Sequence, residues 1–136
     1  MRHILMTIPL LLFGIQSFGQ DTNQIDMNLR ACLDSSQNYT TLGMIHCTYC
    51  AEQSWDAKMN KYYKLLQGVL TADGKEKLKE SQIKWLAYRD AELSTISTIF
   101  DLQGTMWSVV REDERMELVK HRALELGDYY ATLTQH

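Results

Sequence analysis

Apolar side chains recur every three or four positions through most of the chain after residue 40, which is the spacing of one face of an α-helix. In the first long run, the apolar stripe consists of Met44, Cys47, Ala51, Trp55, Met59, Tyr63, Leu66 and Leu70. Thr40 and Thr41 stand before this run, and a threonine hydroxyl can cap the first turn of a helix. The pattern therefore predicts a long helix that begins at one of these threonines and reaches about Leu70.

The same spacing predicts three further helices, separated by short polar or glycine-containing turns. We expect a short helix at residues 24–33, a long one at 75–102 and a last one at 106–126, with Gly127 as its stop signal. Proline is absent after Pro9, and we find no convincing alternation of apolar and polar residues of the kind that marks a strand. The expected fold is all-α, a helical hairpin or small bundle of about four helices stapled by one disulfide.

The N-terminus has the parts of a secretory signal peptide. A short basic start precedes an apolar run at residues 4–15, and the small residues Ser17 and Gly19 stand where a signal peptidase recognises its site. The apolar run is shorter than the roughly 20 residues that a membrane-spanning helix needs. We therefore predict that residues 1–19 are a cleaved signal peptide.

Cleavage there leaves residues 20–136, which have the size of a single domain, with its core at about residues 24–126. The mature protein is then periplasmic or secreted and has no stable membrane insertion. The net charge of the whole chain is −3, which argues against a nucleic-acid partner because such proteins present basic faces.

Three cysteines, Cys32, Cys47 and Cys50, predict one disulfide and one remaining thiol in an exported protein. The spacing Cys47-x-x-Cys50 does not fit a c-type haem site, because Ala51 stands where a histidine is needed, and no strand precedes it as in thioredoxin-type sites. A structural disulfide between Cys32 and Cys47 is favoured, since Cys47 lies on the apolar stripe. A zinc site that includes Cys32 and His46 is the alternative.

Two sets of polar and aromatic residues share helix faces in the two long central helices. The sets are Asp56, Asn60 and Tyr63 in the first helix, and Gln82, Trp85, Tyr88, Arg89 and Asp90 in the second. Neither set contains a nucleophile beside a base or a pair of carboxyl groups arranged for acid–base catalysis. We predict no catalytic residue, cofactor or metal, and interpret the sets as a polar network between helices, in which Arg89 pairs with Asp56 or another carboxylate.

These two sets resemble the motifs of the lysozyme inhibitor LprI-like family. The run at residues 55–66 is similar to the family stretch D-x-x-L-N-x-x-Y-x-x-L, with Met59 in place of the leucine. The run at residues 78–90 is similar to its most distinctive signature, L-x-x-x-Q-x-x-W-x-x-Y-R-D. The resemblance spans about residues 28–126.

The cysteines both support this resemblance and depart from it. Cys32 and Cys47 resemble the N-terminal cysteine pair of the family. Two further cysteines that the family often has are replaced here, by Leu93 and in the region of Arg115, while Cys50 is an addition.

The resemblance implies an exported, non-enzymatic, all-helical protein that binds a protein partner, and for at least some members it implies inhibition of lysozyme. The two sets are then structural or interface residues. An acidic body speeds encounter with a basic muramidase, and the turns at residues 72–74 and 103–105 are candidates to enter its cleft. Two alternatives are a structural or adaptor protein of the cell envelope with another protein partner, and an enzyme or metal-binding protein that uses Cys50, His46 and Cys32.

Overall fold

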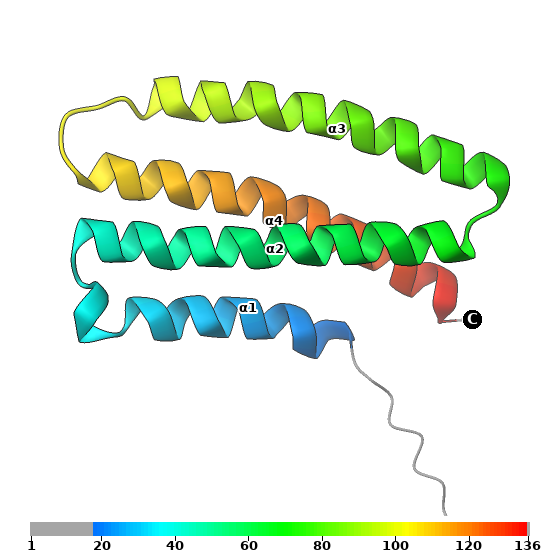
Figure 1. The fold of residues 1–136 in the computed structure, drawn as a ribbon, viewed down its shortest axis with the longest axis horizontal. Coiled ribbons are helices and arrows are strands. Elements are labelled where there is room, and N and C mark those ends of the chain that lie inside the picture. Colours follow the sequence, from blue (N-terminus) through cyan, green and yellow to red (C-terminus); the bar gives the residue numbers. More distant parts are fainter. Residues whose placement is uncertain (1–17, 136) are drawn as a thin grey trace, which may run out of the picture.

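A computed structural model describes residues 18–135, and this part of the chain contains helices and no strand, which confirms the all-α expectation. The elements are α1 (Phe18–Leu33), the 3₁₀-helix η1 (Ser36–Asn38), α2 (Thr41–Val69), α3 (Ala72–Ile99) and α4 (Met106–Thr134). Figure 1 shows α2 and α4 side by side and running in the same direction, with α1 along one side of the pair and α3 along the other.

The predicted signal peptide falls almost entirely on residues 1–17, which lie outside the described residues, so its cleavage stays a prediction. α1 begins at Phe18, ahead of the expected helix start at residue 24. Among residues 18–135, no helix combines the length and the apolar composition that a membrane span requires.

Threonine hydroxyls start both central helices. Oγ1 of Thr40 accepts a hydrogen bond from the backbone N–H of Gly43 at 3.1 Å, which confirms Thr40 as the cap of α2. Oγ1 of Thr71 accepts from the N–H of Gly74 at 3.2 Å in the same way. The expectation of a turn at residues 72–74 is therefore wrong, because the Thr71 cap lets α3 begin at Ala72.

α4 continues through Gly127 to Thr134, so the predicted stop at Gly127 is wrong. A glycine that ends a helix has a positive φ, and within the described chain only Gly104 has one. Gly127 serves packing instead: a Cβ placed on it would lie 2.9 Å from Cε2 of Tyr62 on α2. The missing side chain allows the Tyr62 ring to lie directly against α4.

The core lies between α2 and α4. α2 supplies Ala51, Trp55, Met59, Tyr62 and Leu66, and α4 supplies Met116, Val119, Ala123 and Leu126. Trp55, Leu66, Met116 and Leu126 are among the largest side chains that are fully buried. These residues recur at three- and four-residue spacing, which puts them on one face of each helix. In α2 the buried tyrosine is Tyr62, whereas the predicted Tyr63 is only partly buried.

α3 lies at the edge of this core. Of its 28 residues, only Leu78 and Ile96 are buried. Ile83 and Tyr88 are exposed along its middle. α3 is therefore attached at a few points rather than along its whole length.

α1 is attached to the core pair by a disulfide, a charged contact and the partly buried Ile25 and Leu29, which pack on the core. The predicted bond between Cys32 and Cys47 is present, with 5.7 Å between the Cα atoms, and it joins α1 to α2. A closed loop of this length stabilises a protein by about 3 kcal/mol through restriction of the unfolded chain. On α4, Nζ of Lys120 donates to both carboxylate oxygens of Asp26 on α1, at 2.9 and 3.0 Å.

We predict that Gly127→Ala lowers the free energy of unfolding by about 1–3 kcal/mol, because the added methyl group overpacks against the buried Tyr62 ring. Gly68→Ala is the matched control, since Gly68 is also helical but has open space around it. There alanine should be neutral or raise stability by up to about 1 kcal/mol. Urea unfolding followed by circular dichroism measures both, and equal effects would contradict the close approach at Gly127.

Candidate functional site

A groove of about 460 Å³ lies between α2 and α3 and brings the two predicted polar sets together. Its lining consists of Asp56, Met59, Asn60, Tyr63, Lys79, Gln82, Ile83, Leu86 and Arg89. All three predicted residues of α2 line it, and so do two of the five from α3. The other three, Trp85, Tyr88 and Asp90, are not part of the lining.

The hydrogen bonds at this groove mostly stay within one helix. Nδ2 of Asn60 donates to the backbone oxygen and to Oδ2 of Asp56, at 2.9 and 3.0 Å. The hydroxyl of Tyr63 accepts from Nε2 of Gln67, also on α2, at 3.1 Å. Across the groove, Nε2 of Gln82 reaches Sδ of Met59 at 3.6 Å, and a thioether is a weak acceptor.

α3 is attached to α4 through the guanidinium group of Arg122, which is 7% exposed. Its Nε donates to Oε1 of Gln82 and its Nη2 to Oγ of Ser81, both at 3.1 Å, while Nη1 donates to Glu125 on α4. The same group lies 5.9 Å from the centre of the Trp85 ring, within cation–π range. The glutamine and tryptophan of the predicted signature therefore hold α3 on α4.

Arg89 is the other cation at this ring, 5.7 Å from the centre of Trp85. Its Nη2 and Nε donate to Oδ1 of Asp90 at 2.8 and 3.1 Å, so the carboxylate that it meets is Asp90 rather than Asp56. The Asp90 side chain is mostly exposed, and so is Tyr88. An exposed ion pair of this kind contributes little to stability.

A second candidate surface lies at the end of the bundle where α3 is connected to α4. This end carries the exposed apolar side chains of Tyr39, Leu42, Ile99, Leu102 and Met106. Figure 1 shows the α1–α2 and α3–α4 connections at this same end, and Oγ1 of Thr41 donates to Oγ1 of Thr105 at 3.3 Å between them. We call these five side chains together with residues 100–105 the loop end.

Of the two turns that the sequence offers as candidates to enter a cleft, the structure shows one as an exposed connection and the other as part of a helix. Residues 103–105 lie in the connection and are exposed, as the sequence predicts. Residues 72–74 form the first turn of α3 instead of a free loop.

The sequence profile of the family described as lysozyme inhibitor LprI matches residues 32–126, which includes both runs that carry the groove and the Arg122 contacts. The chain belongs to the lysozyme inhibitor LprI family. A crystal structure of an uncharacterized protein from Burkholderia thailandensis has a similar fold, with a TM-score of 0.77 and 32% sequence identity. That similarity covers 82% of this chain and 55% of the other, so this chain spans about half the length of its relative. A comparison with curated proteins gives no significant match.

The additional cysteine of this LprI-family chain lies near the disulfide. Cys50 is exposed, with its Sγ 3.7 Å from Nε2 of His46, and it lines a cavity of about 190 Å³ together with Cys32 and Cys47. The disulfide occupies two of the sulfur atoms that a zinc site would need. Within residues 24–135, no group of three or more histidine, cysteine or acidic residues is arranged to hold a metal ion.

Glu52 of α2 and Glu112 of α4 form a carboxyl pair that the sequence pattern does not single out. Partial burial is the largest reason why the pKa of Glu52 is raised. The charge of Arg115 lowers this pKa, while the charge of Glu112 and a hydrogen bond with it raise it again. Only the packing of α2 on α4 brings the two carboxyl groups together, so helix periodicity alone cannot reveal them.

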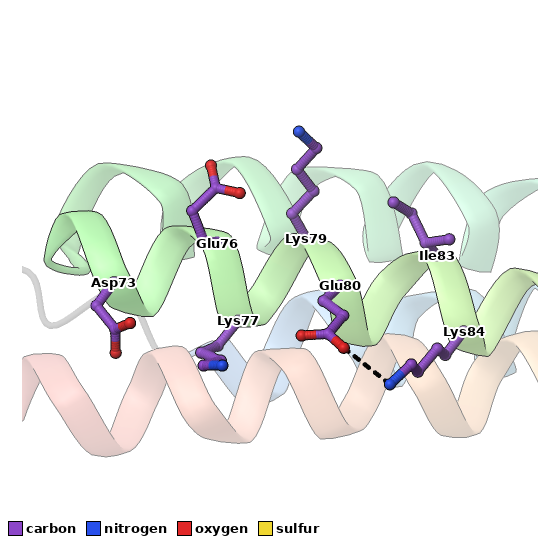
Figure 2. A pocket seen from close by; sticks show the side chains of 7 residues that line it. All are labelled: Asp73, Glu76, Lys77, Lys79, Glu80, Ile83 and Lys84. Carbon is purple, nitrogen blue, oxygen red and sulfur yellow. Dashed lines mark hydrogen bonds and ion pairs between the residues drawn. The ribbon is translucent and has the colours of Figure 1, made fainter.

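The outer face of α3 has a shallow pocket of about 280 Å³ that one helix forms alone. Figure 2 shows Asp73, Lys77, Glu80 and Lys84 along one side of it, and Glu76, Lys79 and Ile83 along the other. Glu80 and Lys84 form an ion pair at 2.8 Å, and both side chains are more than half exposed. Alternating charges on one open helix face are typical of a solvated surface.

We predict that Arg122→Ala lowers the free energy of unfolding by about 2–4 kcal/mol, because it removes the two charge-assisted hydrogen bonds between α4 and α3. Lys84→Ala is the control, since it removes only an exposed ion pair and should change stability by about 0.5 kcal/mol or less. Urea unfolding of both variants measures the difference. Similar values for the two would show that Arg122 does not attach α3.

We also predict that native, oxidised protein takes up one thiol-alkylating group per chain, at Cys50, because Cys32 and Cys47 are bonded to each other. Intact mass before and after treatment with iodoacetamide counts the groups, and peptide mapping locates them. The Cys50→Ser variant should take up none. Two or three groups on the native protein alkylated without prior reduction, or modification at Cys47, would contradict the pairing.

Proposed function

We propose that this protein is an exported inhibitor that binds a lysozyme-type muramidase and blocks its cleft. Membership of the lysozyme inhibitor LprI family over residues 32–126 is the observation that carries the proposal. The protein has no enzymatic role in this proposal: it acts by binding a protein partner outside the cytoplasm, after removal of residues 1–19.

The charge of the chain supports this choice of partner. The sequence has a net charge of −3, and muramidases of the lysozyme type are commonly basic. Opposite net charges accelerate the encounter of two proteins and favour the correct partner over like-charged ones. The interaction should therefore associate more slowly as the salt concentration rises.

The contacts of the signature support a structural role for part of it. Gln82 and Trp85 are engaged by Arg122, so they organise the helices rather than offer a free surface. Binding to the muramidase then depends on other, exposed residues. A lysozyme inhibitor and an envelope adaptor could share this scaffold, and only the partner distinguishes them.

We predict that the purified protein inhibits at least one class of lysozyme at micromolar concentration or below. Release of dye from labelled peptidoglycan measures the activity of the enzyme, and titration should reach a plateau at about one inhibitor per enzyme. The same protein, reduced and unfolded, is the control for unspecific effects of an acidic chain. No inhibition of any lysozyme class would reject the proposal and favour the adaptor alternative.

A further inference from the structure

The loop end carries five large apolar side chains that are exposed. Leu42, Leu102 and Met106 are 76%, 51% and 62% exposed, and Ile99 and Tyr39 are exposed beside them. Clustered apolar side chains on the surface of a protein mark an interaction site far more often than single ones do. Leu42, Ile99 and Met106 belong to α2, α3 and α4, whereas Tyr39 and Leu102 lie in the connections before α2 and after α3. The hydrogen bond between Thr41 and Thr105 links the start of α2 to the start of α4.

Side-chain contacts join the two ends of the connection within the loop end. The rings of Phe100 and Trp107 stack across its base with 6.0 Å between their centres, and Nη1 of Arg111 donates to the backbone oxygen of Phe100 at 3.0 Å. Gly104 has φ +109°, a conformation that other residues rarely adopt, and it turns the chain at the tip. A loop that is already ordered loses little conformational entropy when it binds, so it can bind tightly with a small contact area.

The charges around the loop end fit the cleft of a muramidase. Residues 102–106 carry no charge, and Asp101 is the one charged side chain in the connection. Glycosidase clefts hold two catalytic carboxyl groups, which would repel an acidic tip and accept hydrogen bonds from an amide. Gln103 offers such an amide, with the same carbonyl and N–H groups as the acetamido substituents of peptidoglycan sugars.

The acidic residues of α4 lie behind this uncharged tip. Asp113 and Glu114 are exposed and follow Met106 by about two turns of helix, or roughly 10–12 Å. A tip that enters a cleft would bring these carboxylates close to the rim, where opposite charges on a basic muramidase would attract them. The loop end therefore presents an uncharged tip to the catalytic carboxyl groups at the bottom of the cleft. Its acidic groups face the basic surface around the cleft.

We propose that the loop end is the part of this protein that enters the muramidase cleft, with Gln103 and Gly104 at the tip and Leu102 and Met106 against the cleft walls. This inference rests on the proposed inhibitor function. Because the loop end occupies the substrate cleft, the inhibitor and an oligosaccharide substrate analogue compete for the same site on the enzyme.

Two substitutions test the inference with the full chain. Leu102→Asp puts a charge on an apolar contact, and Gln103→Glu replaces the amide by a carboxylate of the same shape. Each should weaken the binding of a lysozyme that the wild-type protein inhibits by roughly tenfold or more, the size expected for a central contact. Leu133→Asp is the matched control, because Leu133 is a similarly exposed leucine, 53% against 51%, at the other end of α4, and it should change the affinity less than twofold.

Calorimetric titration into that lysozyme, with and without a chitin oligosaccharide in its cleft, gives the affinities. The oligosaccharide should compete with the wild-type protein. If the wild type inhibits while both loop-end variants bind as tightly as it does, the inference is overturned and the inhibitor function stands. If the wild type binds no lysozyme, both are overturned.

Sedimentation of the free protein tests the alternative that the loop end binds a second copy of the chain. A dimer that Leu102→Asp dissociates, with lysozyme inhibition unchanged, would assign the loop end to self-association and overturn the inference. A monomeric wild type together with the loss of affinity in both variants supports it. Circular dichroism of all three variants should match the wild type, since Leu102, Gln103 and Leu133 are exposed.

Discussion

The apolar stripe of α2 is buried against α4 along much of the two helices, and each other element is attached to this pair. Trp55, Leu66, Met116 and Leu126 fill the contact, and Gly127 lets the Tyr62 ring approach the α4 backbone. Burial of large apolar side chains is the main favourable term in folding. Because this one contact is extensive, α1 and α3 need fewer attachments. α1 is held by the disulfide, the Lys120–Asp26 ion pair and the packing of Ile25 and Leu29 on the core. α3 is held by Arg122, by the buried Leu78 and Ile96, and by the partly buried Trp85.

Features that depend on local sequence could be predicted without the structure. The three- and four-residue spacing locates α2 and the helical run of α4, since it decides which face is buried. The hydroxyl of Thr40 could be recognised as a cap because capping involves residues only three positions apart. The disulfide between Cys32 and Cys47 followed from the apolar position of Cys47 and the short distance along the chain.

Features that depend on the partner helix could not be predicted in this way. A glycine such as Gly127 is typical of a helix end. Its actual role is to make room for the ring of Tyr62, which lies far from it in the sequence. The pair of Glu52 and Glu112 and the partners of Arg122 likewise need the relative position of two helices. The spacing of α3 resembles that of α2, yet most of α3 is exposed, because periodicity shows which residues share a face and not how completely a neighbour covers it.

In the candidate site, too, the sequence predicts which residues share a helix face but not which residues meet between two helices. The sequence places Asp56, Asn60 and Tyr63 on one helix face, and the structure shows that this face lines a groove with Gln82 and Arg89. The expected network across the two helices is weak, because Asn60 bonds within α2 and Arg89 bonds to its neighbour Asp90. Polar residues that share a face can be satisfied by their own helix, so spacing alone does not establish a contact between helices.

In the proposed inhibitor, the signature acts through the attachment of α3 and needs no contact with the muramidase. Trp85 and Gln82 hold the middle of α3 on Arg122, and Ile96 is buried near its end. Phe100 and Trp107 then stack at the point where the chain leaves α3 and enters α4. These contacts join the two stems of the connection, and residues 101–106 between them are exposed. In the proposed inhibitor, the signature sets the position of the tip, and the tip residues, which lie outside the signature, determine which cleft it fits.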